Sequence, residues 1–96
     1  MPVHIWHPTN PDGNPFQNNG EVTYVCEGEW DFAVQVDRLE KWVEENKDSL
    51  TKGRYVADVG FRLREGATGG GPTLSIEFMK VLVEIGMELF FSEYDD

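Results

Sequence analysis

Apolar and polar residues alternate along two stretches of the chain, from Trp30 to Val36 and from Tyr55 to Arg64. Alternate side chains of an extended backbone point to the same face, so each stretch places its apolar residues on one side of a sheet. Both stretches are therefore predicted to be strands. Three further strands are expected: a short one with Val3 and Ile5, one from Glu21 to Glu27, and one from Met87 to about Tyr94.

A change from strand to helical spacing marks the first predicted helix. Asp37 and Glu40 form the pattern of a capping box, and the apolar positions Leu39, Trp42, Val43 and Leu50 follow. This pattern predicts a helix from about Arg38 to Leu50 or Thr51.

A second predicted helix begins after Ser75, a residue type that caps helix N-termini, and ends at Gly86. Its apolar positions are Phe78, Met79, Leu82 and Ile85. Gly28 lies between the second strand and the Trp30 strand, which predicts a hairpin with Glu27 and Glu29 at its tip.

This order of elements predicts a single α+β domain over residues 1–96. We expect a four- to five-stranded, mainly antiparallel sheet with both helices packed on one face. A chain of 96 residues with 40% hydrophobic residues is long enough to form a core of this kind.

Negative charge dominates the composition. There are 8 Lys+Arg against 18 Asp+Glu, which gives a formal net charge of −10, and no Lys or Arg precedes Arg38. So acidic a chain repels phosphate groups, which disfavours direct binding to nucleic acid or to an anionic membrane. The excess of negative charge favours a basic protein or a ribonucleoprotein complex as the partner, with the protein itself a monomer or a homodimer.

One cysteine and the absence of a long apolar run bear on the compartment. Cys26 cannot form an internal disulfide, and no stretch approaches the roughly 18 apolar residues of a membrane span. We expect a cytoplasmic protein.

Residues 8–20 are rich in Pro, Asn and Gly, which predicts a long loop. Loops of this length in a compact domain are usually functional or mobile. Phe16 is the apolar residue within it, and it either packs onto the core or is presented to a partner.

The second half of the chain resembles a known group of proteins. A strand and a glycine-containing loop precede Gly71-Pro72-Thr73-Leu74-Ser75, and Glu84-Ile85-Gly86-Met87-Glu88-Leu89 leads into the closing strand. This order is similar to that of a family of small bacterial α/β proteins of unknown function, some of which are encoded near toxin and immunity loci. The resemblance implies no catalytic residue.

Two candidate chemistries, a metal site and a cysteine nucleophile, are weaker than their structural alternatives. His4 and His7, with Asp12 or Glu21, carry metal-ligand chemistry, but a spacing of three on a strand turns the two rings to opposite faces. Cys26 is followed by Glu27 and Glu29, which disfavour a thiolate nucleophile. We therefore expect no enzyme activity, no cofactor and no metal.

The glycine-rich segment 66–71 lacks the Lys and the Ser or Thr of a phosphate-binding loop. Arg62 and Arg64 precede it, so an anion site near this loop remains open. One alternative is therefore a small-ligand or anion-binding module that uses His7, Arg62 and Arg64. Another is a homo-oligomeric structural protein that pairs through Met87 to Tyr94, because Leu89, Phe90 and Phe91 cannot all be buried on one face.

The acidic group on the predicted hairpin is the main functional hypothesis. Carboxylates on a rigid turn can imitate the charges of a nucleic-acid backbone and bind the basic groove of a protein that handles nucleic acid. This predicts a small inhibitor of the immunity-protein or phage anti-defence type, such as an anti-CRISPR protein. The predicted partner-binding residues are Phe16, Glu21, Glu27, Glu29, Trp30 and Asp31.

Overall fold

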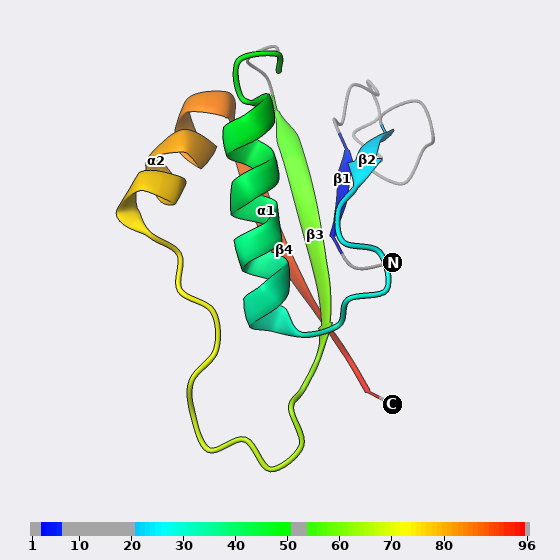
Figure 1. Cartoon of the computed structure of the whole chain (residues 1–96). Helices are drawn as coiled ribbons and strands as arrows, with labels where there is room; N and C mark the ends of the chain where they lie inside the picture. The colour runs from blue at the N-terminus through cyan, green and yellow to red at the C-terminus, as the bar shows by residue number, and fades with distance from the viewer. Residues whose placement is uncertain (1–2, 7–20, 51–53, 96) are drawn as a thin grey trace.

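The computed structural model describes residues 3–6, 21–50 and 54–95 of the chain (Figure 1). Four strands and two helices lie in these segments. In chain order they are β1 (His4–Trp6), β2 (Glu21–Tyr24), α1 (Phe32–Asn46), β3 (Tyr55–Arg62), α2 (Ile76–Ile85) and β4 (Met87–Tyr94).

The strands form one mixed sheet in the order β2-β1-β3-β4. β1 pairs antiparallel with both β2 and β3, whereas β3 and β4 run parallel in an unbroken register from Tyr55 opposite Met87 to Arg62 opposite Tyr94. The parallel pair needs a crossover, and α2 supplies it. The predicted α+β fold with a mainly antiparallel sheet is confirmed.

Both helices contribute to one core on one face of the sheet. Ile5, Ala57 and Val59 point to this face, where they meet buried residues of both helices. α1 packs over β3, and α2 lies beside α1 and packs against β4 (Figure 1). The buried helix residues in this core are Val36, Leu39, Val43, Phe78, Val81, Leu82 and Ile85. Neither helix is long and apolar enough to cross a membrane.

The second half of the chain folds largely as predicted. Ser75 caps α2 by accepting a hydrogen bond from the amide of Phe78 over 3.0 Å, and Gly86 ends the helix in the left-handed conformation. β3 and β4 occupy the expected positions, although β3 ends at Arg62 rather than Arg64.

The predicted strand from Trp30 to Val36 is wrong, because α1 already begins at Phe32. Two of its four alternating apolar residues also fit a helix, since Phe32 and Val36 lie on the stripe that continues through Leu39 to Val43. The longer helical pattern prevails because it buries one continuous stripe against the sheet. The helix ends at Asn46, and Leu50 packs on the core beyond it.

The predicted cap at Asp37 and the predicted hairpin are wrong for the same reason. The helix is capped by Asp31, whose Oδ1 accepts a hydrogen bond from the amide of Val34 over 3.1 Å, while Asp37 is an exposed residue within the helix. A turn does form at Gly28, but it leads from β2 into α1 rather than into another strand.

The position of the cap can be tested by replacing each aspartate with alanine. We expect Asp31→Ala to lower the free energy of unfolding by about 1 kcal/mol, since the first turn loses a side-chain acceptor. Asp37→Ala is the matched control and changes it by less than about 0.5 kcal/mol. Urea unfolding followed by circular dichroism measures both, and a larger loss in Asp37→Ala would contradict this assignment.

Candidate functional site

The segment from Cys26 to Asp31 joins β2 to α1 and contains most of the predicted site. The amide of Glu29 donates to the carbonyl of Cys26 over 3.1 Å, and Gly28 has a φ of 85°, which favours glycine. Glu27 and Gly28 are exposed in the resulting turn. The carboxylate of Glu29 lies 3.4 Å from the amide of Asp31, a long contact that leaves most of its hydrogen-bonding capacity available.

A buried glutamine fixes this segment to the sheet. Gln35 is completely buried, and its Nε2 donates to the carbonyl of Glu29 and to the carbonyl of Gly60, each over 2.6 Å. The amide of Arg62 also donates to the carbonyl of Trp30 over 3.1 Å. Two contacts, one through the side chain of Gln35 and one through the amide of Arg62, therefore hold the β2–α1 connection to the end of β3. The carboxylates of this connection extend from a backbone that these hydrogen bonds fix in place.

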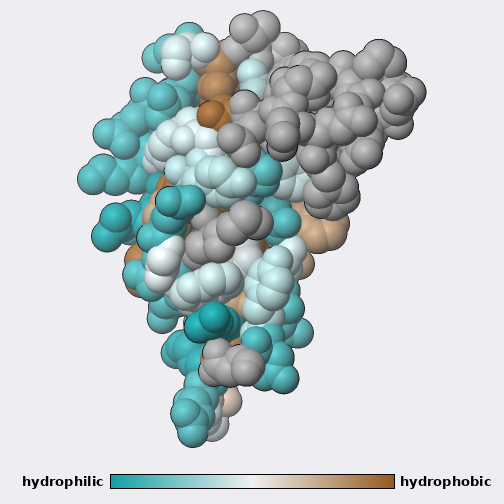
Figure 2. Space-filling view, turned by 90° about the vertical axis from the view of Figure 1, so that its right-hand side faces the viewer, coloured by the Kyte–Doolittle hydropathy of each residue, from teal (hydrophilic) through white to brown (hydrophobic). Residues whose placement is uncertain are grey.

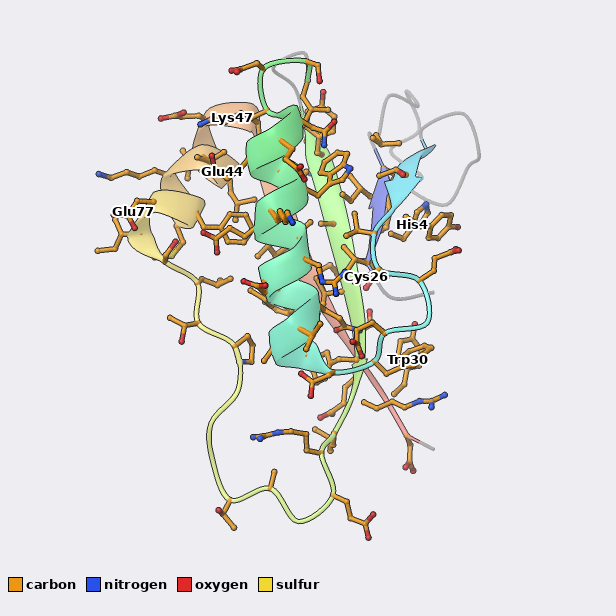
Figure 3. The ribbon with its side chains drawn as sticks, viewed as in Figure 1. His4, Cys26, Trp30, Glu44, Lys47 and Glu77 are labelled. Carbon is orange, nitrogen blue, oxygen red and sulfur yellow. The ribbon has the colours of Figure 1, made fainter. Side chains whose placement is uncertain are left out.

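Trp30 lies against side chains from the ends of β3 and β4. The guanidinium carbon of Arg62 is 4.4 Å from the centre of the indole ring, a cation–π distance. The ring of Tyr94 meets Trp30 edge-on with centroids 5.8 Å apart. Figure 3 shows Trp30 where the sheet ends, beside the last residues of β4.

Gly60 allows Tyr94 to take this position. A Cβ atom at residue 60 would lie 2.8 Å from Cε2 of Tyr94, so any larger residue would displace the phenol ring. The ring covers the strand backbone at Gly60 and turns its edge to Trp30.

Two more carboxylates reach this end of the molecule from β4. Arg62, Glu93, Tyr94 and Asp95 line a hollow of about 390 Å³ together with Leu63. Segments more than sixty positions apart in the sequence thus supply acidic groups at the end of the molecule where Trp30 meets Tyr94. We call this surface the acidic end and define it by Glu27, Glu29, Asp31, Glu93 and Asp95.

The space-filling view supports a polar surface here. Seen from the side of β2, mainly hydrophilic residues cover the lower part of the molecule, where β3 and β4 end (Figure 2). Glu27, Glu93, Tyr94 and Asp95 are exposed, and Glu29, Trp30 and Asp31 are half-buried.

The structure brings together four of the predicted partner-binding residues and adds three. Glu27, Glu29, Trp30 and Asp31 share one short connection, although Asp31 also caps α1. Phe16 lies outside the described residues, and Glu21 belongs to β2, where it pairs with Trp6 of β1. The residues predicted from the sequence do not include Glu93, Tyr94 and Asp95. The one signal for them in the sequence is the acidic residues at the close of the last strand.

His4 packs within an aromatic group. Its ring stacks on Tyr24 with centroids 4.4 Å apart and lies 5.0 Å from the ring of Trp6. Within residues 3–6, 21–50 and 54–95, no three His, Cys, Asp or Glu residues are placed to hold a metal ion. Of the residues with metal-ligand chemistry named above, His7 and Asp12 lie outside these segments, and Glu21 belongs to β2.

Cys26 has the environment of an unreactive thiol. Burial raises its pKa, and Glu29 raises it further, while Arg38 acts in the opposite direction. A raised thiol pKa lowers the thiolate fraction at neutral pH, so nucleophilic chemistry is disfavoured.

A second hollow lies between the first turn of α1 and the glycine-rich loop. It has a volume of about 490 Å³, and Asp31, Phe32, Phe61, Arg62 and Arg64 line it together with Ala67 and loop residues 69–72. Phe32 and Phe61 stack in parallel with centroids 4.0 Å apart. Nη2 of Arg64 donates to the carbonyl of Gly69, which closes the loop over this hollow.

Comparison with known proteins does not identify the chain: no protein-family model matches it, and neither the curated proteins nor the solved structures contain a significant match. The resemblance of its second half to small proteins near toxin and immunity loci stays a prediction.

The role of Gln35 can be tested with Gln35→Met, which keeps the side-chain volume and removes both donors. We expect the free energy of unfolding to fall by about 1–3 kcal/mol, because the carbonyl of Gly60, which is buried, and that of Glu29, which is partly buried, each lose a hydrogen bond. Removal of the buried Oε1 of Gln35, which has no hydrogen-bond partner among the described residues, offsets part of this loss. In heteronuclear NMR spectra of the folded protein, the largest amide shifts should occur at residues 27–31. A loss below about 0.5 kcal/mol, or shifts confined to α1, would contradict the anchoring role.

Proposed function

We propose that this protein is a small, acidic, non-enzymatic inhibitor that binds and blocks a basic, nucleic-acid-handling protein. It is of the immunity-protein or phage anti-defence type, with anti-CRISPR activity as one form. The acidic end is the binding surface and imitates the charge pattern of a nucleic-acid backbone. The partner is a basic protein or ribonucleoprotein complex in the cytoplasm.

The observation that supports this proposal most strongly is that two acidic segments lie at the same end of the molecule. Glu27 and Glu29 precede Trp30 in the β2–α1 connection, Glu93 and Asp95 flank Tyr94 at the end of β4, and the rings of Trp30 and Tyr94 meet there. Carboxylates steer a basic partner into contact, and buried aromatic anchors supply affinity once it has docked. Hydrogen bonds from Gln35 hold the connection in place, so little ordering entropy is lost on binding.

The proposal is tested with a variant in which four acidic residues are replaced by lysine: Glu27→Lys, Glu29→Lys, Glu93→Lys and Asp95→Lys. Asp31 is left unchanged because it caps α1. The tagged protein is used to capture partners from a bacterial lysate at about 0.05 M and about 0.5 M salt, where screening shortens the reach of surface charges. We expect one basic protein at low salt, reduced capture at high salt, and at least about 100-fold weaker binding by the variant.

The matched control reverses four exposed acids on or just after the helices: Asp37, Glu45, Asp48 and Glu84. Its net charge changes by the same amount, so any general effect of charge appears equally in both variants. The captured protein is then purified, and its nucleic-acid binding is measured with and without the wild-type chain. Equal loss in the two variants, or no competition with nucleic acid, would refute the proposal.

The hollow beside the glycine-rich loop favours a second candidate function, an anion-binding module. Its volume of about 490 Å³ is within the range of small-ligand pockets, and Arg62 and Arg64 both line it. Arginine is well suited to phosphate and carboxylate groups because its donors bind them in pairs.

Titration with inorganic phosphate, followed by NMR, tests the second candidate. We expect saturable shifts at residues 62–72 and 31–33, with a dissociation constant near about 1 mM or lower. Arg64→Gln should weaken binding about tenfold or more, whereas Arg54→Gln, which removes an exposed cation paired with Glu88 at 3.7 Å, should not. Unsaturable shifts, or equal effects of both substitutions, would remove this candidate.

A further inference from the structure

Exposed large apolar side chains gather on two adjoining elements. Within the described segments they are Val22, Leu63, Ile76, Met79, Val83, Phe90, Phe91 and Tyr94, and all but Val22 and Leu63 belong to α2 or β4. α2 is the crossover that leads into β4 and packs against it. The apolar exposure is therefore concentrated along one lateral edge of the sandwich, formed by β4 and α2.

β4 is an edge strand without the usual protection. It pairs along all eight of its positions with β3, and β3 is its one neighbour in the sheet that the described residues form. Edge strands are usually blunted by charged residues, above all Lys, by Pro or by a bulge; β4 contains Glu88 and Glu93 but no Lys, Pro or bulge. Phe90 is 59% exposed on one face and Phe91 is 46% exposed on the other.

α2 presents an apolar row beside this edge. Ile76, Met79 and Val83 follow each other at spacings of three and four, opposite the buried positions Phe78 and Leu82. Val83 is 79% exposed, although the helix as a whole is well packed on the core. A row of this kind on the outer face of a helix is typical of a contact with another helix.

We propose that the edge formed by β4 and α2 joins two copies of this chain into a symmetric dimer. β4 pairs antiparallel with β4 of the second copy, which extends the sheet across both molecules. A two-fold axis perpendicular to the sheet keeps the helices of both copies on the same side, so α2 packs against its own counterpart.

The sequence of β4 favours a second copy as the partner, because it is complementary to itself. Such an axis requires facing residues to point to the same side, so a residue at the centre faces itself. With Phe90 at the centre, Leu89 faces Phe91, and Glu88 faces Ser92. Apolar residues then meet apolar residues at the centre, Met87 faces Glu93 further out, and no carboxylate lies directly opposite another.

The dimer predicts a salt dependence opposite to that of partner binding. Two chains with a net charge of −10 repel each other, and added salt screens this repulsion. Self-association should therefore strengthen between about 0.05 M and 0.5 M salt, whereas the capture of a basic partner should weaken. Because it is measured on the purified chain alone, dimerisation can fail or succeed independently of the proposed inhibitor function.

The register is tested by cross-linking in a Cys26→Ser background. At the two-fold axis, Phe90→Cys brings two thiols together, since facing residues have Cα atoms about 4.5–5.5 Å apart, within the range of a disulfide. Glu88→Cys is the control, because its counterpart lies four positions away, at roughly 13 Å. We expect a mild copper oxidant to cross-link the first variant rapidly and the second at least about tenfold more slowly.

Sedimentation velocity over a range of concentrations tests the interface itself. Phe90→Lys places like charges face to face and should raise the dimer dissociation constant at least about 100-fold, and Val83→Lys at least about tenfold. Leu63→Lys is the matched control, since Leu63 is 70% exposed but lies outside β4 and α2. A monomer up to about 1 mM, or a dimer that Phe90→Lys does not weaken, would overturn the proposal.

Discussion

The two hydrogen bonds from the buried amide of Gln35 hold the parts of this structure together. One reaches the carbonyl of Glu29 and the other reaches the carbonyl of Gly60, so a single side chain of α1 fixes both the connection before the helix and the central strand. Both acceptors are main-chain oxygens, and an amide nitrogen with two hydrogens can satisfy them together. The position of Trp30, and through it that of the acidic end, follows from this anchor.

The second half of the chain was predictable because its signals agree with one another. Tyr55, Ala57, Val59 and Phe61 place apolar residues at every second position of β3, and Ser75 and Gly86 mark both ends of α2. The stretch around Trp30 was mistaken because two periods fit it. Aspartate occurs at both position 31 and position 37, and the sequence alone does not say which of the two caps the helix. The helix prevails because Phe32, Val36, Leu39 and Val43 form one stripe.

The site was predictable in part. Glu27, Glu29, Trp30 and Asp31 are neighbours in the sequence, so they stay together whichever element follows them. Their meeting with Tyr94 depends on the parallel pairing of β3 with β4, a tertiary feature that no local pattern reveals. The burial of Gln35 could not be predicted from the sequence either, since a glutamine on an amphipathic helix is normally exposed. Its hydrogen-bond partner, the carbonyl of Gly60, is 25 positions away.

The place of β4 in the sheet also constrains how the protein is made. β3 lies between β1 and β4, and β4 is the last of the four strands to leave the ribosome. Until β4 has emerged, one edge of β3 has no strand to pair with, and the buried apolar face of α2 lacks the strand against which it packs. Parallel pairing closes slowly because the crossover must form first, so nascent chains expose an apolar strand edge for longer than an all-hairpin sheet would. Transiently exposed strand edges of this kind are prone to aggregation, and chaperones protect such surfaces during synthesis.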